Sequence, residues 1–287
     1  MKLTTDRGEP MARHFRILSL LSLVLSAMVL SPISVSWAGE ASDRIKASGK
    51  LVVATDPGWP PFSSRDANGN WTGFDVDVAT EIAKRMGAKA EFVAPPWDEQ
   101  VAGHWKGKWD ACVCSMTPTV ERAKNLDFPA NYYWAPVNLA VSAKNMAAKV
   151  PANLSGKRIG FLVPSTYELY LRGEPMGIDG MQPVTHMIDS AIIVPYDSDS
   201  ASFDGVAKGE IDATMNYLPV LMYEIKQGRS MRIIGTPLFY VSDAVAIDKG
   251  DPELSALIKN NVEGMIADGT IGALSMKWFQ FDLSKAP

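Results

Sequence analysis

The sequence predicts an α/β protein made of two lobes joined by two crossovers. Three observations lead to this fold class. Strands and helices alternate through most of the chain, a second series of the same kind begins near Lys157, and residues 236–242 have the character of a return crossing. Repeated β-α-β units imply parallel sheets covered by helices. We therefore expect residues 39–136 and 239–287 to form a discontinuous first lobe and residues 137–238 to form the second.

The N-terminal segment has the pattern of a secretory signal peptide. Arg13 and Arg16 precede an apolar run at residues 17–30, and Ser36-Trp-Ala38 offers a small-x-small cleavage site. The run is shorter than the roughly 20 residues that a membrane span needs. We expect residues 1–38 to be removed and the exported chain not to be inserted in the membrane. Translation can start at Met1 or at Met11.

Composition narrows the class of partner. Removing the four basic and two acidic residues of segment 1–38 from totals of 28 and 32 leaves 24 and 30, a net charge of −6. An acidic chain of this kind is not expected to bind nucleic acid or anionic membranes.

The metal-ligating side chains are few. Outside the leader only His104 and His186 remain, so we predict no metal site and no cofactor. Cys112 and Cys114 are the only cysteines. Export permits a disulfide, but an i, i+2 pair on one strand has poor geometry for one. Burial as small apolar residues is therefore the prediction.

The elements of the first lobe follow from hydrophobic periodicity. Residues 74–86 form an amphipathic pattern with Phe74, Val78 and Ile82 on one face, and Gly87 ends it. We expect a further helix at 98–105 and strands at 51–55, 90–94 and 109–114.

The second series repeats the pattern. We expect strands at 157–163, 192–196 and 212–215, and helices at 165–171, 202–208 and 218–226. Two amphipathic helices at 252–268 and 271–279 complete the chain.

The segment from Cys114 to Arg122 predicts a carboxylate contact. Pro118 suits the first position of a helix and Thr117 suits its N-cap. Free N–H groups at the helix start, the hydroxyls of Ser115 and Thr117, and the Arg122 guanidinium would then meet an anion. The alternative is an ordinary capped helix whose Arg122 pairs with a nearby acid such as Asp127.

Other strand ends supply matching groups. Trp59 lies in a stiff loop with three prolines, and Trp97 follows the next strand after a Pro-Pro pair. These rings are predicted to wall one pocket, although a Trp packed under its own loop is an equal alternative for Trp59. Ser165 or Thr166 would cap a helix of the second lobe and offer a second anion contact.

The motifs together resemble those of a known family. Their order and spacing resemble periplasmic solute-binding proteins of the polar amino-acid and opine class, which serve ABC importers, over about residues 49–281. The segments that carry the resemblance are Thr55-Asp-Pro-Gly-Trp-Pro-Pro-Phe62, Gly73-Phe-Asp-Val-Asp-Val-Ala79, Ser115-Met-Thr-Pro-Thr-Val-Glu-Arg122, Asp127-Phe-Pro129, Gly209-Glu-Ile-Asp-Ala213, and Asp268-Gly-Thr270 with Lys277-Trp-Phe279.

The resemblance implies a two-lobed periplasmic-binding-protein fold with a two-stranded hinge. It also implies that Arg122 holds a ligand carboxylate, that Trp59 and Trp97 sandwich the side chain, and that Asp56 meets its polar end. The expected ligand-binding residues are Asp56, Trp59, Trp97, Ser115, Met116, Thr117, Arg122, Ser165, Thr166, Asn216 and Tyr217.

One position departs from the family pattern. Tyr217, with Asn216 beside it, stands where the family usually has an aspartate for the ligand ammonium. A phenol accepts a hydrogen bond but brings no full charge, and a buried ammonium without a counter-charge is costly. We therefore expect a substituted, displaced or absent α-amino group, as in an opine, betaine or imino acid. Alternatively, Asp56 or Glu168 supplies the missing charge.

The expected function is a periplasmic, monomeric solute-binding protein that closes on a small amino acid or derivative and delivers it to permease subunits, without enzymatic activity. The alternative is a periplasmic enzyme on the same scaffold, resembling cyclohexadienyl dehydratase. No nucleophile-base pair is evident in the sequence for such chemistry.

Overall fold

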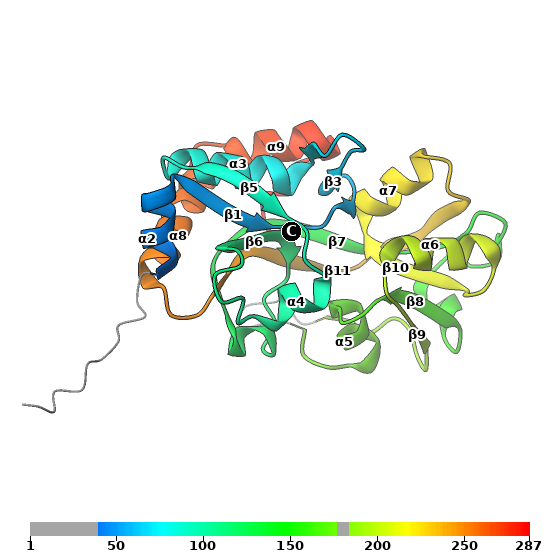
Figure 1. The fold of residues 1–287 in the computed structure, drawn as a ribbon. Helices are drawn as coiled ribbons and strands as arrows, with labels where there is room; N and C mark the ends of the chain where they lie inside the picture. Colours follow the sequence, from blue (N-terminus) through cyan, green and yellow to red (C-terminus); the bar gives the residue numbers. More distant parts are fainter. Residues whose placement is uncertain (1–39, 177–183) are drawn as a thin grey trace, which may run out of the picture. The chain divides into compact units, whose positions relative to one another are not determined.

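An eight-stranded mixed sheet is the central element of the fold. The computed structural model describes residues 40–176 and 184–287. The sheet has the order β5-β1-β6-β11-β7-β10-β8-β9, and a small three-stranded sheet has the order β2-β3-β4 (Figure 1). The strands are β1 (Lys50–Ala54), β2 (Gly58–Trp59), β3 (Ser63–Arg65), β4 (Trp71–Thr72), β5 (Lys89–Val93), β6 (Ala111–Met116), β7 (Leu126–Ser142), β8 (Arg158–Leu162), β9 (Ile192–Tyr196), β10 (Ala213–Tyr217) and β11 (Met231–Asp248).

The strands fall into two parallel groups linked by two long antiparallel strands. β1 pairs in parallel with β5 and β6, and β8 pairs in parallel with β9 and β10. β7 and β11 pair with each other along most of their length and contact both groups. The predicted β-α-β alternation is confirmed in each group, whereas the two long strands were not predicted as continuous elements.

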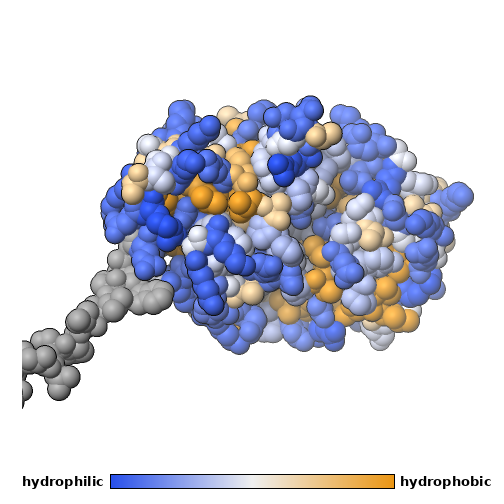
Figure 2. All heavy atoms as spheres, viewed as in Figure 1, coloured by the Kyte–Doolittle hydropathy of each residue, from blue (hydrophilic) through white to orange (hydrophobic). Residues whose placement is uncertain are grey.

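Helices cover the sheet and bury their apolar faces on it. In Figure 1, α3 and α9 lie together beside β1 and β5, and α6 and α7 lie beside β10. The predicted face of α3 is confirmed, because Phe74, Val78 and Ile82 are fully buried. Figure 2, drawn from the same side as Figure 1, shows that the outer surface seen from there is mainly hydrophilic. The helices are α2 (Glu40–Ser48), α3 (Phe74–Arg85), α4 (Trp97–Ala102), α5 (Thr166–Arg172), α6 (Asp199–Lys208), α7 (Leu218–Lys226), α8 (Pro252–Ala267) and α9 (Thr270–Phe279), with 3₁₀ turns η1 (Arg122–Lys124) and η2 (Pro151–Leu154).

Two predictions about local structure are wrong. No α-helix follows Pro118; the chain continues without regular structure to the single 3₁₀ turn η1, which begins at Arg122. Thr117 cannot cap a helix because its hydroxyl donates to Asp243 instead, at 2.8 Å. Helix α6 begins at Asp199, three residues before the predicted start, because Ser198 is its N-cap and accepts a hydrogen bond from the Ala201 amide at 3.2 Å.

Cys112 and Cys114 are buried as expected, but the prediction that they form no disulfide is wrong. Cys112 and Cys114 form a disulfide, with their Cα atoms 5.5 Å apart, inside the usual range for such bonds. A regular strand would separate i and i+2 by about 6.5 Å. Strand β6 is irregular here: Cys112 and Met116 pair with Ala246 and Ala244 of β11, so two extra residues lie on the β6 side. This bulge brings the two cysteines close enough to bond.

The remaining expectations concern the two lobes, the signal peptide and membrane insertion. Residues 38–287 form one compact unit, so the division into lobes at 136/137 and 238/239 stays a prediction. The signal peptide expected at residues 1–38 lies outside the described residues. Among the residues that the structure describes, no helix is long and apolar enough to cross a membrane.

Candidate ligand-binding site

A polar cavity lies at the carboxyl ends of parallel strands from both groups, where open α/β sheets bind ligands. It is narrow, about 60 Å³, room for roughly four to six water molecules. Nine of the eleven predicted site residues line it. The full lining is Asp56, Trp59, Trp97, Cys114, Ser115, Thr117, Arg122, Leu162, Ser165, Thr166, Tyr167, Asp199 and Tyr217.

The other two predicted residues support the wall from behind. Met116 is fully buried and packs in a cluster with Trp105 and Trp109. Asn216 is also fully buried, and its side-chain oxygen accepts a hydrogen bond from the Tyr217 amide at 2.8 Å. Both side chains therefore act on the site through their neighbours.

Arg122 supplies the positive charge of the cavity. Its Nη1 donates to the Thr117 carbonyl at 2.9 Å, and its Cζ lies 5.1 Å from the centre of a Trp97 ring. Burial lowers the pKa of Arg122 to about 10, against the opposing effect of Tyr217, Asp243 and Tyr167. The guanidinium thus remains charged at neutral pH. It has five N–H donors, so most of them are still free for an anion.

The buried carboxylate of Asp243 lies behind Tyr217, the residue found where the family usually has an aspartate. Tyr217 Oη donates to Asp243 Oδ1 at 3.0 Å, and Thr117 Oγ1 donates to the same oxygen at 2.8 Å. Burial raises the pKa of Asp243 to about 7, although hydrogen bonds from Thr117 and Tyr217 oppose this rise. Because the phenol proton points to Asp243, the lone pairs of Tyr217 are left as acceptors. Sequence reasoning missed Asp243, which lies inside strand β11 with no motif around it.

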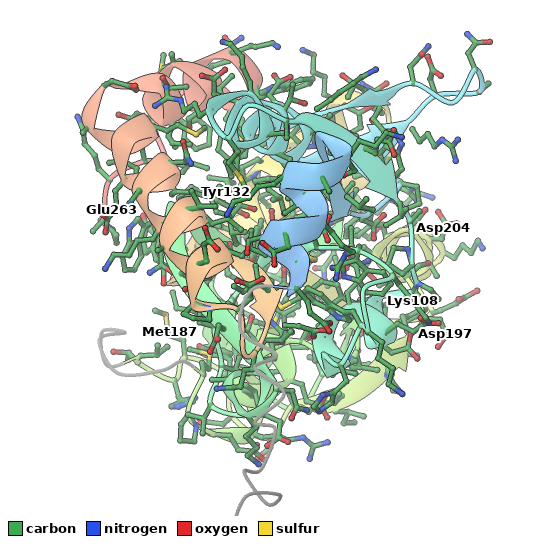
Figure 3. All side chains as sticks on the ribbon, turned by 60° about the vertical axis from the view of Figure 1, so that its left-hand side comes forward. Lys108, Tyr132, Met187, Asp197, Asp204 and Glu263 are labelled. Carbon is green, nitrogen blue, oxygen red and sulfur yellow. A yellow bond between two sulfur atoms is a disulfide. The ribbon has the colours of Figure 1, made fainter. Side chains whose placement is uncertain are left out.

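Ser115 is held by a second buried carboxylate. Its hydroxyl donates to Asp75 Oδ2 at 2.8 Å, its amide donates to Tyr132 Oη at 2.9 Å, and Tyr132 Oη donates to Asp75 Oδ1 at 2.8 Å. Tyr132 lies in the interior of the fold (Figure 3). The Ser115 hydroxyl proton is therefore committed to Asp75, and the network fixes the end of β6 beside Arg122.

Two tryptophans form flat walls of the cavity. Trp59 stacks on Phe62 with ring centres 4.7 Å apart and meets the Tyr217 ring edge-on at 5.2 Å. Trp97 Nε1 donates to the Pro164 carbonyl at 3.0 Å, which joins α4 to the turn before α5. Both rings line the one cavity, and their role as walls that sandwich a ligand stays a prediction.

Two carboxylates, Asp56 and Asp199, form an acidic part of the lining. Asp56 follows β1 and accepts a hydrogen bond from the Gly58 amide at 2.6 Å. Asp199 follows β9 as the first residue of α6. Burial, followed by the charge of Asp56, raises the pKa of Asp199 to about 7, while Asn216 and the Leu162 backbone oppose the rise. Burial also raises the pKa of Asp56.

Asp199 was missed because the start of its helix was misplaced. The signal was present in the sequence: Ser198 is a good N-cap, and it places Asp199 at the carboxyl end of a strand. Glu168, in contrast, does not line this cavity. It forms an ion pair with Arg172 at 2.9 Å and lines an adjoining hollow of about 340 Å³, which meets the cavity at Arg122 and Ser165.

Three lining residues carry a buried polar atom without a hydrogen-bond partner among the described residues: Trp59 Nε1, Ser165 Oγ and Asp199 Oδ1. Buried polar groups in native proteins are nearly always bonded. Donors and an acceptor left over around one cavity therefore indicate a polar ligand. In the described part of the chain no group of three or more His, Cys, Asp or Glu side chains could hold a metal ion.

The sheet topology and this cavity define a small-molecule-binding α/β protein. The chain matches the family model of bacterial extracellular solute-binding proteins, family 3, over residues 51–281. It belongs to this family, as the sequence motifs indicated.

Relatives with known descriptions cover 80–95% of the chain. The L-cystine-binding protein TcyJ of Escherichia coli (strain K12) is 28% identical over 275 residues, covering 95% of this chain and 98% of that protein. The crystal structure of the ancestral amino acid-binding protein AncCDT-1, a precursor of cyclohexadienyl dehydratase, is 32% identical, with a TM-score of 0.70 and coverage of 83% and 98%. An ancestral arginine-binding protein bound to arginine is 31% identical, with a TM-score of 0.69 and coverage of 80% and 98%.

Proposed function

We propose that the chain is the periplasmic, amino-acid-binding component of an ABC importer, and that Arg122 holds the carboxylate of its ligand. The observation that carries the proposal is the partly buried guanidinium of Arg122 in a cavity between two tryptophan walls. The relatives described as binding L-cystine, amino acids or arginine support an amino acid as the ligand class.

The carboxylate is held from both strand groups. Arg122 and Thr117 belong to the segment after β6, and the unpartnered Ser165 hydroxyl belongs to the turn after β8. A guanidinium and a hydroxyl donor together suit a planar carboxylate. The indole ring of Trp97 keeps the guanidinium in place by stacking on it.

The size of the cavity and the course of two strands support closure by a hinge motion. The cavity of about 60 Å³ is too small for most amino acids, so its walls must separate for a ligand to enter. Strands β7 and β11 change register where the lobe boundaries at 136/137 and 238/239 were expected: Ile234 and Phe239 of β11 pair with Leu139 and Val137 of β7. The unpaired residues 235–238 are suited to absorb a hinge motion between lobes 39–136 with 239–287 and 137–238.

Calorimetry with a panel of free and N-substituted amino acids tests this function, with mass spectrometry of co-purified ligand as a first screen. Arg122→Ala is expected to weaken binding of the best ligand by about 2–5 kcal/mol, because it leaves a desolvated carboxylate without its partner. Lys124→Ala is the matched control, since Lys124 is exposed and pairs only with Glu121 on the surface.

Two outcomes would overturn the proposal. An unchanged dissociation constant in Arg122→Ala would remove the carboxylate contact. Turnover of prephenate or arogenate by the purified protein would instead make it an enzyme, the alternative that the scaffold allows.

A further inference from the structure

The charged residues that line the cavity follow different strands: Arg122 comes after β6, Asp56 after β1, and Asp199 after β9, the strand at the far edge of the sheet. The groups whose charges act on Arg122 are Tyr217, Asp243 and Tyr167. Those that act on Asp199 are Asp56 and Glu224. Tyr167, which also lines the cavity, responds to both Asp199 and Arg122, so it lies within reach of both. We call the part of the lining at Arg122 the cationic end of the cavity and the part at Asp56 and Asp199 its acidic end.

The acidic end carries more negative charge than its surroundings neutralise. Arg122 is the only basic side chain among the described residues that line the cavity. The other acid whose charge acts on Asp199, Glu224, is itself paired with Arg229 at 2.6 Å. Asp199 Oδ1 is buried and has no hydrogen-bond partner within the part of the chain that the structure describes. An unpaired buried carboxylate is expensive, and a cationic ligand group would remove that cost.

We infer that Asp199, together with Asp56, binds a cationic group of the ligand at the end distal to its carboxylate, an ammonium or a guanidinium. This inference rests on the proposed function and specifies its ligand class. Beside Arg122, the phenol of Tyr217, whose proton is directed to Asp243, brings no full charge for an α-ammonium group. Selectivity is therefore exerted at the far end of the cavity, by a residue outside the motifs of the family resemblance.

Proton exchange accompanies this binding. Two adjacent carboxylates resist simultaneous ionisation in a buried site, and the pKa of Asp199 is raised to about 7 by burial and by Asp56 and Glu224, with Asn216 and Leu162 opposing. A cation between the two carboxylates favours their ionised forms. Binding of a basic ligand near neutral pH is therefore expected to release a proton.

The experiment combines a ligand series with a pair of variants. The probes are L-lysine and L-arginine, then L-norleucine, which lacks the distal ammonium of lysine, and 6-aminohexanoate, which lacks its α-amino group. Asp199→Asn is compared with Asp197→Asn, a control two residues away at the surface (Figure 3). Isothermal titration in buffers of different ionisation enthalpy reports both affinity and proton release.

We expect wild-type protein to bind at least one basic probe more tightly than L-norleucine and to release a proton on doing so. Asp199→Asn should lose about 30-fold or more in affinity for the basic probes, the effect of truncating one partner of a buried charge pair. It should change binding of L-norleucine little and abolish most of the proton release. Asp197→Asn should behave as wild type. The melting temperature of ligand-free Asp199→Asn should equal or exceed that of wild type, because an unpaired buried charge is removed; this excludes misfolding as the cause of lost affinity.

The outcomes separate this inference from the proposed function. Tight binding of neutral amino acids with an Arg122-dependent affinity, but no preference for a distal cation, would overturn the inference and leave the function intact. Equal loss of L-lysine and L-norleucine affinity in Asp199→Asn would also overturn it. Failure to bind any amino acid would overturn the function itself.

Discussion

The cationic end and the acidic end of the cavity differ in how completely their polar groups are hydrogen-bonded to one another. At the cationic end Arg122 is bonded to Thr117, and Thr117 and Tyr217 both donate to Asp243. At the acidic end Asp199 Oδ1 has no hydrogen-bond partner in residues 40–176 and 184–287, and the charge of Asp56 acts on its carboxylate. The first end is pre-organised without ligand, whereas the second is completed by a ligand cation. We infer that the cationic end gives affinity for any amino acid and the acidic end gives selectivity.

Removing both carboxylates of the acidic end is the most severe test of this division. The double variant Asp56→Asn with Asp199→Asn should bind L-lysine about 3–5 kcal/mol more weakly than wild type, because a desolvated ammonium loses every counter-charge. The loss should exceed that of either single variant. Affinity for L-norleucine should stay within a few-fold of wild type. Titration calorimetry measures both, and an L-lysine affinity that survives in the double variant would contradict the division.

The disulfide tests the rigidity of the cationic end. Cys114 lines the cavity and its bond with Cys112 closes a short bulge of β6. Replacing both cysteines with serine should lower the free energy of unfolding by about 1–2 kcal/mol, the entropy expected for so small a loop. If the bulge positions the segment that carries Arg122, the affinities for L-lysine and L-norleucine should fall by the same factor. Urea unfolding measures the change in stability, and calorimetry measures the two affinities. A loss of affinity for L-lysine alone would show that the disulfide acts on the acidic end instead.

The same two ends show what sequence patterns can and cannot predict. Strand ends and aromatic walls were predictable, since β9 and α7 have the predicted bounds and Trp59, Trp97 and Arg122 line one cavity. These features depend on local periodicity, on Pro and Gly, and on motifs that the family resemblance supplies.

What the patterns missed depends on contacts between distant segments. Thr117 looked like an N-cap, but a carboxylate from residue 243 takes its hydroxyl. The bulge that allows the Cys112–Cys114 bond is set by pairing with β11. Asp199 was hidden by an error of three residues at one helix start. Such tertiary competition leaves no trace in a local window, except at Ser198, where the cap residue itself was the clue.

The pH dependence of binding separates the two ends without any substitution. The pKa of Asp199 in the ligand-free protein is raised from 3.8 to about 7, so protonation favours the ligand-free form and ionisation favours the complex with a cation. Affinity for L-lysine should therefore rise about tenfold between pH 6 and pH 8 and then level off. Affinity for L-norleucine should change less, because Arg122 stays charged throughout and Asp243, whose pKa is also raised to about 7, acts through its hydrogen bonds from Tyr217 and Thr117. A parallel rise for both ligands would assign the titration to the cationic end.

The same shifts predict the stability of the ligand-free protein. Asp75, Asp199 and Asp243 all have pKa values raised from 3.8 to about 7. Since the folded state binds these protons more tightly than the unfolded state, their contribution to stability is present below about pH 4 and is lost as the pH rises through 7. Urea unfolding across this range should show the decline, with a smaller slope in Asp199→Asn.

The smallest expected effect concerns the phenol that stands in place of an aspartate. Tyr217→Phe removes the hydrogen bond to Asp243 but keeps the ring that meets Trp59 edge-on. Affinity for L-lysine and L-norleucine should fall by the same modest amount, about 0.5–1.5 kcal/mol, because both lose one neutral acceptor beside Arg122. For 6-aminohexanoate, which has no α-amino group, the loss should be smaller. This ordering can arise only if Tyr217 faces the α-amino group while Asp199 faces the distal cation; a selective loss of 6-aminohexanoate in Tyr217→Phe would reverse the assignment of the two ends.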